Sequence, residues 1–173
     1  PEFVAPSPHP YLNSFAKLIS GNPDSFPGIQ MDSSRIAGYQ RKMTKQMEKL
    51  NKKRLLPLKA WYSNILHSRG RNDSLLAFYP FSGGDFLHLY NVYPNATDYV
   101  MMAIEPVGSI PNLKNSKKEF VYEYLQSVEF NLRDVLKLSF FITLNMQQDI
   151  KENPNIDGLL PSIIWGVGAT GHQ

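Results

Sequence analysis

The 173-residue chain contains no cysteine. This absence excludes disulfide bonds, catalysis by a thiolate and zinc sites built on cysteine. The sequence also lacks any run of about 18 apolar residues, so we expect no membrane-spanning helix. The motifs GxSxG, GxxxxGK[ST] and HExxH, which are typical of common hydrolases, nucleotide-binding loops and zinc peptidases, are missing as well. We therefore predict no metal site and no cofactor.

The chain does contain enough apolar residues for one folded domain. Hydrophobic residues make up 42% of it, and a domain of this size buries about 70% of the surface that its unfolded chain exposes. Prolines at positions 6, 8 and 10 favour an extended start. We predict an extended arm and a short helix over residues 1–30, followed by a single α/β domain over residues 31–173 that begins with a basic amphipathic helix.

Two apolar runs, Leu75–Phe81 and Tyr99–Ile104, lie near the middle of the chain. Neither run alternates strictly, which is typical of strands covered on both faces. Between them, the turn at Ser82–Asp85 leads into a predicted short helix over residues 86–93, with Asp85 able to cap it. This strand, helix, strand order favours parallel strands. We predict a mixed, largely parallel sheet covered by helices on both faces, with an α+β fold as the alternative.

Polar side chains follow both predicted strands. Ligands of open α/β sheets bind beyond the carboxyl ends of the strands, where we expect Ser82, Asp85 and Glu105. His88 follows Asp85 by three residues, so their side chains can meet in a helix. Two close carboxylates would become an acid and a base. The alternative is structural, with both carboxylates accepting backbone N–H groups. The candidate catalytic residues are Asp85, Glu105, Ser82 and His88.

A strongly basic helix is predicted after Asp32 or Ser33, either of which can cap it. Between residues 35 and 71 there are eleven lysines and arginines against one acid, Glu48, a net charge of +10. The rest of the chain carries seven bases and fourteen acids, a net charge of −7. The predicted apolar face of the helix comprises Ile36, Tyr39, Met43, Met47 and Leu50.

The opposite face of this helix is a candidate anion-binding surface. It could bind an anionic partner protein or surface, or it could be a solvated face that balances an acidic domain. Nucleic acid is less favoured, because no nucleic-acid-binding motif is present and Tyr39 belongs to the apolar face. The residues of this predicted surface are Arg41, Lys42, Lys45, Lys49, Lys52 and Lys53.

Further elements follow from local patterns. We expect Pro57 to break or kink the helix, and Leu58–Leu66 to continue it with Trp61 and Ile65 turned inward. Ser116 and Glu119 form a capping box. The helix that it predicts buries Phe120, Val121, Tyr124, Leu125 and Val128 and is interrupted at Asn131.

The C-terminal part of the chain contains two further apolar segments. Phe140–Leu144 is predicted as a strand, and Leu159–Trp165 as a second one. Residues 166–171 match GxGxxG, but the helix and the later acid that dinucleotide binding requires have no room before residue 173. We expect these glycines either to allow close packing or to end a short helix.

Several short motifs are shared with a known group of sequences. They are Tyr79-Pro80-Phe81-Ser82-Gly83-x-Asp85-Phe86, Tyr99-Val100, Glu105-Pro106-Val107-Gly108-Ser109, Ser139-Phe140-Phe141-x-Thr143 and Thr170-Gly171-His172. In these the chain resembles a family of uncharacterised bacterial proteins, many of them exported, with Gly84 in place of the proline of the family pattern. The resemblance covers roughly the last hundred residues. It implies a bacterial origin and a secreted or periplasmic location, but no activity.

Three function classes remain open. The first is a non-catalytic binding or interaction module of the bacterial envelope or secreted space. The second is a hydrolase-like enzyme that uses the carboxylate pair. The third is binding of an anionic surface or of nucleic acid through the basic helix. The mutual placement of Ser82, Asp85, His88 and Glu105 distinguishes the second class from the others.

Overall fold

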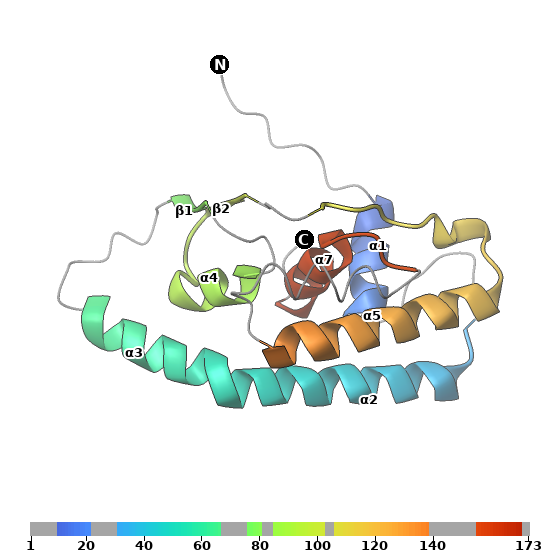
Figure 1. The fold of residues 1–173 in the computed structure, drawn as a ribbon, viewed down its shortest axis with the longest axis horizontal. Coiled ribbons are helices and arrows are strands. Elements are labelled where there is room, and N and C mark those ends of the chain that lie inside the picture. The colour runs from blue at the N-terminus through green and yellow to red at the C-terminus, as the bar shows by residue number, and fades with distance from the viewer. Residues whose placement is uncertain are drawn as a thin grey trace, which may run out of the picture.

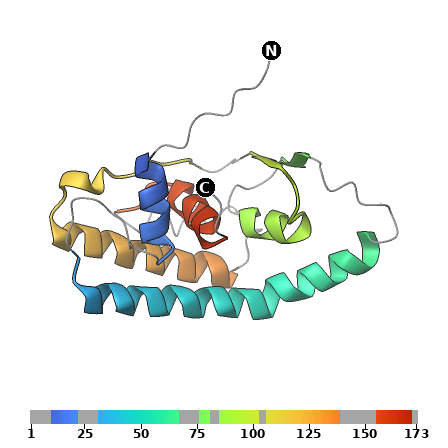
Figure 2. The ribbon, with the colours of Figure 1, turned by 180° about the vertical axis from the view of Figure 1, so that it is seen from behind.

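The computed structural model describes residues 10–21, 31–66, 76–80, 85–102, 106–138 and 155–170. Within these residues the protein is mostly helical with one small sheet (Figures 1 and 2). In chain order the elements are α1 (Pro10–Ile19), α2 (Ser33–Leu50), the π-helix η1 (Asn51–Leu55), α3 (Leu56–Leu66), β1 (Leu76–Tyr79), α4 (Phe86–Val92), β2 (Asp98–Met101), the 3₁₀-helix η4 (Leu113–Asn115), α5 (Lys118–Leu138) and α7 (Leu160–Ala169). None of the helices described could cross a bilayer, judged by length and hydropathy.

The segments α2, η1 and α3 form one continuous helical rod along an edge of the molecule (Figure 1). Asp32 caps its start, with its side chain accepting from the backbone N–H groups of Ser34 and Arg35, as predicted. The rod bends where α2 passes into α3. Of the two outcomes expected at Pro57, the helix shows the bend and not the break. Pro57 lies in the first turn of α3, and the five residues 51–55 before it form a π-helix that accommodates a residue without an N–H to donate.

Helix α5 lies along α2, and the two bury a shared apolar face. The predicted face of α2 is confirmed by the burial of Ile36, Tyr39, Met43 and Leu50. On α5 the prediction holds for Val121, Tyr124, Leu125 and Val128 but is wrong for Phe120, which is 38% exposed. Asn131 does not interrupt α5 either, and it is buried within the helix.

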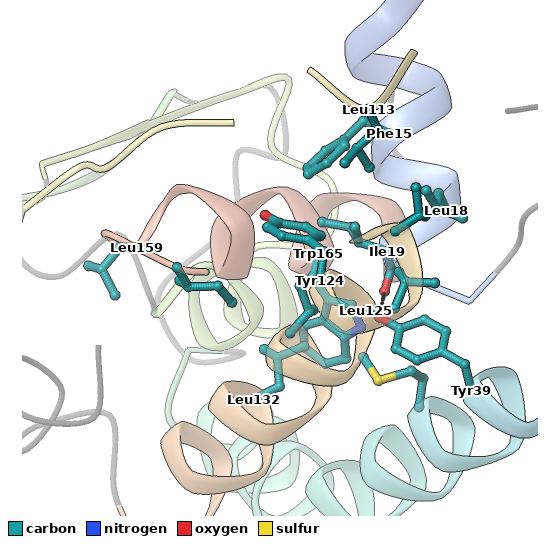
Figure 3. Close-up of a cluster of buried hydrophobic side chains, with 14 of the residues drawn as sticks. Phe15, Leu18, Ile19, Tyr39, Leu113, Tyr124, Leu125, Leu132, Leu159 and Trp165 are labelled. Atoms are coloured by element: carbon teal, nitrogen blue, oxygen red, sulfur yellow. Dashed lines mark hydrogen bonds between the residues drawn. The ribbon is translucent and has the colours of Figure 1, made fainter. Parts of the chain in front are cut away.

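The core is completed by the first and last helices, α1 and α7, which pack against each other. Figure 3 shows Trp165 of α7 among Tyr124, Leu125 and Ile19, contributed by α5 and α1. The hydroxyl of Tyr39 donates to the backbone oxygen of Ile19 at 2.6 Å, which ties α2 to the end of α1. The core therefore draws on residues from both ends of the described chain.

The predicted strand over Leu159–Trp165 is wrong, because this segment enters helix α7. Pro161 lies in the first turn, where its missing N–H costs no hydrogen bond. Two glycines of the GxGxxG match, Gly166 and Gly168, do serve close packing, and the third, Gly171, lies outside the described residues. A Cβ on Gly168 would lie 2.7 Å from the backbone oxygen of Ala16 in α1, and one on Gly166 would lie 3.3 Å from the Phe86 ring. Close approach of α7 to its neighbours therefore requires these glycines.

The middle of the chain forms the predicted strand, helix, strand unit. Strands β1 and β2 are parallel, with Leu76 paired to Asp98 and Tyr79 to Met101, and α4 connects them. The expectation that helices cover both faces of the sheet does not hold for the described residues. Leu76, Phe78 and Val100 are each more than 40% exposed, whereas Ala77 is buried. The sheet is thus a two-stranded layer with one covered face in the described part of the chain.

Candidate functional site

A cavity of about 410 Å³ opens between the α2–η1 segment and α5. We call it the basic groove. Among the described residues that line it, six are cationic and one is acidic, a net charge of +5. They are Lys42, Lys45, Gln46, Lys49, Leu50, Lys53, Arg54, Glu129 and Arg133.

The basic groove follows from the spacing of lysines along α2. Lys45, Lys49 and Lys53 follow one another at four-residue steps, so they share one side of the rod. The adjoining side carries the apolar residues that pack on α5. Leu50, which is 3% exposed, belongs to both the core and the lining. The lysines are thereby held along the seam between two packed helices instead of being spread over a convex surface.

Side-chain contacts across the seam position α5 at the rim of the groove. The Lys42 ammonium lies 2.9 Å from a carboxylate oxygen of Glu129, and the Gln46 side chain donates to the backbone oxygen of Glu129 at 3.3 Å. Lys42 is 60% exposed, so this ion pair adds little to stability. The Arg133 guanidinium lies 4.7 Å from the centre of the Phe130 ring. These contacts orient the α5 side chains that meet the lysines of α2.

The basic groove contains part of the anion-binding surface predicted from the sequence. Lys42, Lys45, Lys49 and Lys53 line it, whereas Arg41 and Lys52 are exposed and do not belong to its lining. Sequence reasoning missed Arg54 and, on α5, Glu129 and Arg133. The run Lys52-Lys53-Arg54 was a signal for Arg54. No local signal could identify the α5 residues, because their approach to α2 is a long-range contact.

The second candidate site is centred on Asp85 and His88. The two side chains meet as predicted, with Nδ1 of His88 lying 3.7 Å from a carboxylate oxygen of Asp85. Asp85 is 2% exposed. The prediction that its side chain caps α4 is wrong, since no cap hydrogen bond forms there. Its carboxylate instead accepts a 3.1 Å hydrogen bond from the hydroxyl of Tyr79 at the end of β1.

Burial shifts the pKa values around this pair. Burial and, secondarily, the positive charge of Arg54 lower the pKa of His88 to about 4. The imidazole is therefore neutral at pH 7, and its contact with Asp85 is not an ion pair there. Burial, followed by the negative charge of Asp85, raises the pKa of Tyr79 to about 12, so the phenol stays protonated and donates.

The lowered pKa of His88 predicts a loss of stability in acid. Below pH 6.5 the unfolded chain binds a proton at this imidazole, while the folded chain binds it only near pH 4. The free energy of unfolding should therefore fall between about pH 6.5 and pH 4, by at most about 3 kcal/mol from this group. In His88→Gln this part of the fall should be absent in urea titrations at a series of pH values. If the free energy of unfolding depended on pH in the same way in both proteins, the lowered pKa of His88 would be contradicted.

The other two candidate catalytic residues, Ser82 and Glu105, lie outside the described residues, and so does the predicted strand over Phe140–Leu144. The carboxylate pair of Asp85 and Glu105 therefore stays a prediction. The structure does bring Tyr79, Asp85 and His88 together. Arg54 connects this cluster to the basic groove, because it lines the groove and its charge acts on His88.

Comparison with known proteins adds no further constraint. No family model, no curated protein and no solved structure matches this chain. The resemblance to an exported bacterial family thus stays a prediction. The described residues also contain no cluster of three or more histidine or acidic side chains that could hold a metal ion.

Proposed function

We propose that this protein is a non-catalytic binding module that takes a phosphate-bearing anion in the basic groove. The observation that carries the proposal is the convergence of Lys45, Lys49 and Lys53 with Arg133, from two packed helices, on one concave space. A cleft lined by one sign of charge concentrates its field on the enclosed space and raises the local concentration of ligands of opposite charge.

The size and lining of the groove favour a compact polyanion. Its volume of about 410 Å³ falls in the range of small-molecule sites. Lysine ammonium groups bind phosphate as point charges, and arginine adds a planar fork for its oxygens. The described lining contains no aromatic side chain, so it offers no platform for stacking bases, which single-stranded nucleic acid binding uses.

Charge reversal inside the groove should abolish most of the binding. We expect inositol hexakisphosphate, a soluble polyanion, to bind the native protein in isothermal titration calorimetry, with affinity falling steeply as salt rises. In Lys49→Glu/Lys53→Glu the affinity should fall at least about 100-fold, because like charges placed against a ligand cost several kcal/mol.

A matched control separates the groove from the overall charge. Arg41→Glu/Lys52→Glu changes the net charge of the same rod by the same amount, at exposed positions outside the lining. This variant should keep the affinity for inositol hexakisphosphate within about threefold of the native value, since surface charges beyond the contact are screened. Equal losses of affinity for inositol hexakisphosphate in the two double variants would contradict a binding site at the basic groove.

Catalysis by the Asp85–His88 pair has less support than anion binding. Asp85 is 2% exposed and the His88 side chain 15% exposed, and neither is among the described residues that line the basic groove. We also propose a location in the bacterial envelope or secreted space, which rests on the sequence resemblance alone.

A further inference from the structure

Helix α3 exposes three large apolar side chains, and the prediction that two of them, Trp61 and Ile65, turn inward is wrong. Trp61 is 58% exposed, Leu56 54% and Ile65 42%. An adjoining side of α3 packs on α4, where the rings of Tyr62 and Tyr93 meet edge to face with their centres 5.5 Å apart. The helix is therefore anchored through one side while Trp61 lies on the surface. Trp61 and Ile65 are four residues apart and therefore adjoin on the helix surface, and adjoining exposed apolar side chains mark interaction sites.

The exposed apolar residues continue the cationic row of the basic groove. Lys49 and Trp61 are twelve residues apart, and the π-helical turn between them holds one residue more than an α-helical turn. They are therefore separated by about eleven α-helical steps of about 100° each and lie on nearly the same side of the rod, with Ile65 the next residue of the ridge after Trp61. Figures 1 and 2 show α3 extending beyond the end of α5, so the ridge leaves the groove and runs onto the open end of the rod. Anion-binding and apolar features thus adjoin on one surface.

We propose that the anion of the basic groove is presented by a lipid bilayer, onto which α3 docks by inserting Trp61 and Ile65 between the headgroups. This inference rests on the proposed function, because it names the source of the phosphate that the groove binds. Tryptophan prefers the boundary between headgroups and acyl chains. A helix with basic residues and a few large apolar ones lies in that plane, where each signal alone gives weak binding and the two together give stable binding.

Charge complementarity favours an anionic bilayer over a protein partner. Residues 33–66 carry nine lysines and arginines and one acid, a net charge of +8, which matches the negative surface of a membrane that contains anionic lipids. A helix that binds in the groove of another protein presents a continuous row of apolar anchors. In α3 the exposed apolar residues are instead interspersed with Lys59 and Asn64, which are also exposed.

Vesicle sedimentation with the full chain tests this inference. We expect the protein to bind vesicles of phosphatidylcholine with about 30% phosphatidylglycerol and not vesicles of phosphatidylcholine alone. Trp61→Ser/Ile65→Ser should weaken binding to the mixed vesicles at least about tenfold while keeping the affinity for inositol hexakisphosphate within about twofold. Lys49→Glu/Lys53→Glu should lose both. In native protein the tryptophan emission should shift to the blue on vesicle binding, and in Trp61→Phe it should not.

The control removes a comparable apolar pair from the opposite edge of the molecule. Leu76 and Phe78 are 55% and 59% exposed on β1, and both views show α4 between β1 and α3 (Figures 1 and 2). Leu76→Ser/Phe78→Ser should bind mixed vesicles as the native protein does. Native binding by the Trp61→Ser/Ile65→Ser variant would overturn the docking of α3.

Two further results would overturn the inference and identify another source or partner. Binding of inositol hexakisphosphate without any binding to mixed vesicles would leave the groove as a site for a free anion. Self-association in analytical ultracentrifugation without lipid, abolished by Trp61→Ser/Ile65→Ser, would assign the apolar pair to a contact between two copies of the chain. A failure of the proposed function is distinct from both, since neither inositol hexakisphosphate nor vesicles would then bind.

Discussion

Replacing Trp165 by alanine is expected to lower the free energy of unfolding by about 3–5 kcal/mol. Trp165 is 2% exposed and packs among residues from α1, α5 and α7 (Figure 3). Removing the indole would leave a cavity between helices that are far apart in the chain, and the remaining side chains could fill only part of it. Urea denaturation followed by circular dichroism measures the change.

The chain provides its own control for this prediction, because Trp61 is the only other tryptophan. Trp61 is 58% exposed, so Trp61→Ala should change the free energy of unfolding by no more than about 0.5 kcal/mol. Trp165→Phe should lose less than about 1.5 kcal/mol, since the buried indole N–H has no hydrogen-bond partner among the described residues. Similar losses in Trp165→Ala and Trp61→Ala would contradict the assignment of the core.

Replacing Gly108 by alanine is expected to destabilise the protein by about 3 kcal/mol or more. Gly108 has a φ of +72°, and a Cβ there would lie 2.5 Å from the backbone nitrogen of Gly158. The left-handed conformation alone costs a residue with a Cβ about 1–2 kcal/mol. The contact with backbone adds to this cost, because neither segment can yield by changing a rotamer.

Hydrogen bonds hold the two segments at this close approach. The backbone N–H and hydroxyl of Ser109 both donate to the Asp157 carboxylate at 2.8 Å, and the N–H of Leu159 donates to the backbone oxygen of Pro106 at 3.0 Å. Moving the chains apart to admit a Cβ would break these bonds. The loss in Gly108→Ala is measured by urea denaturation.

Gly38→Ala is the matched control, with the opposite expected sign. Gly38 lies inside α2, and a Cβ there meets nothing within 4 Å. Alanine should therefore stabilise the protein by about 0.5–1 kcal/mol through the lower entropy of the unfolded chain. A loss of stability in Gly38→Ala, or none in Gly108→Ala, would show that the two glycines are not distinguished by their surroundings.

Local patterns predicted those elements whose residues carry their own start signals or periodicity. Asp32 followed by the apolar spacing from Ile36 to Leu50 was sufficient for α2, and the turn before Asp85 with its flanking apolar runs was sufficient for the parallel β1–α4–β2 unit. In both cases the signals that decide the prediction lie within the segment itself. The basic face of α2 could be predicted equally well, because charge is a property of the residues themselves.

What the sequence did not reveal depends on contacts between distant segments. Leu159–Trp165 has the composition of a strand, but packing against α1 and α4 makes it a helix. Trp61 was expected to turn inward, yet α3 contacts α4 through Tyr62 and leaves Trp61 on the surface. Likewise, nothing near Arg133 indicates that it would meet the lysines of α2. Propensity and hydropathy cannot decide which face of a helix finds a partner.

The π-helix η1 determines where the surface of α3 points. At its end, the N–H of Leu56 bonds to the oxygen of Asn51, five residues back, so this turn holds one residue more than an α-helical turn would. If the same residues formed α-helical turns throughout, the extra residue would rotate α3 by about 100° relative to α2. The side chains now packed on α4 would then turn away from it. The π-helical turn that accommodates this extra residue therefore determines which side of α3 faces α4 and which side faces outward.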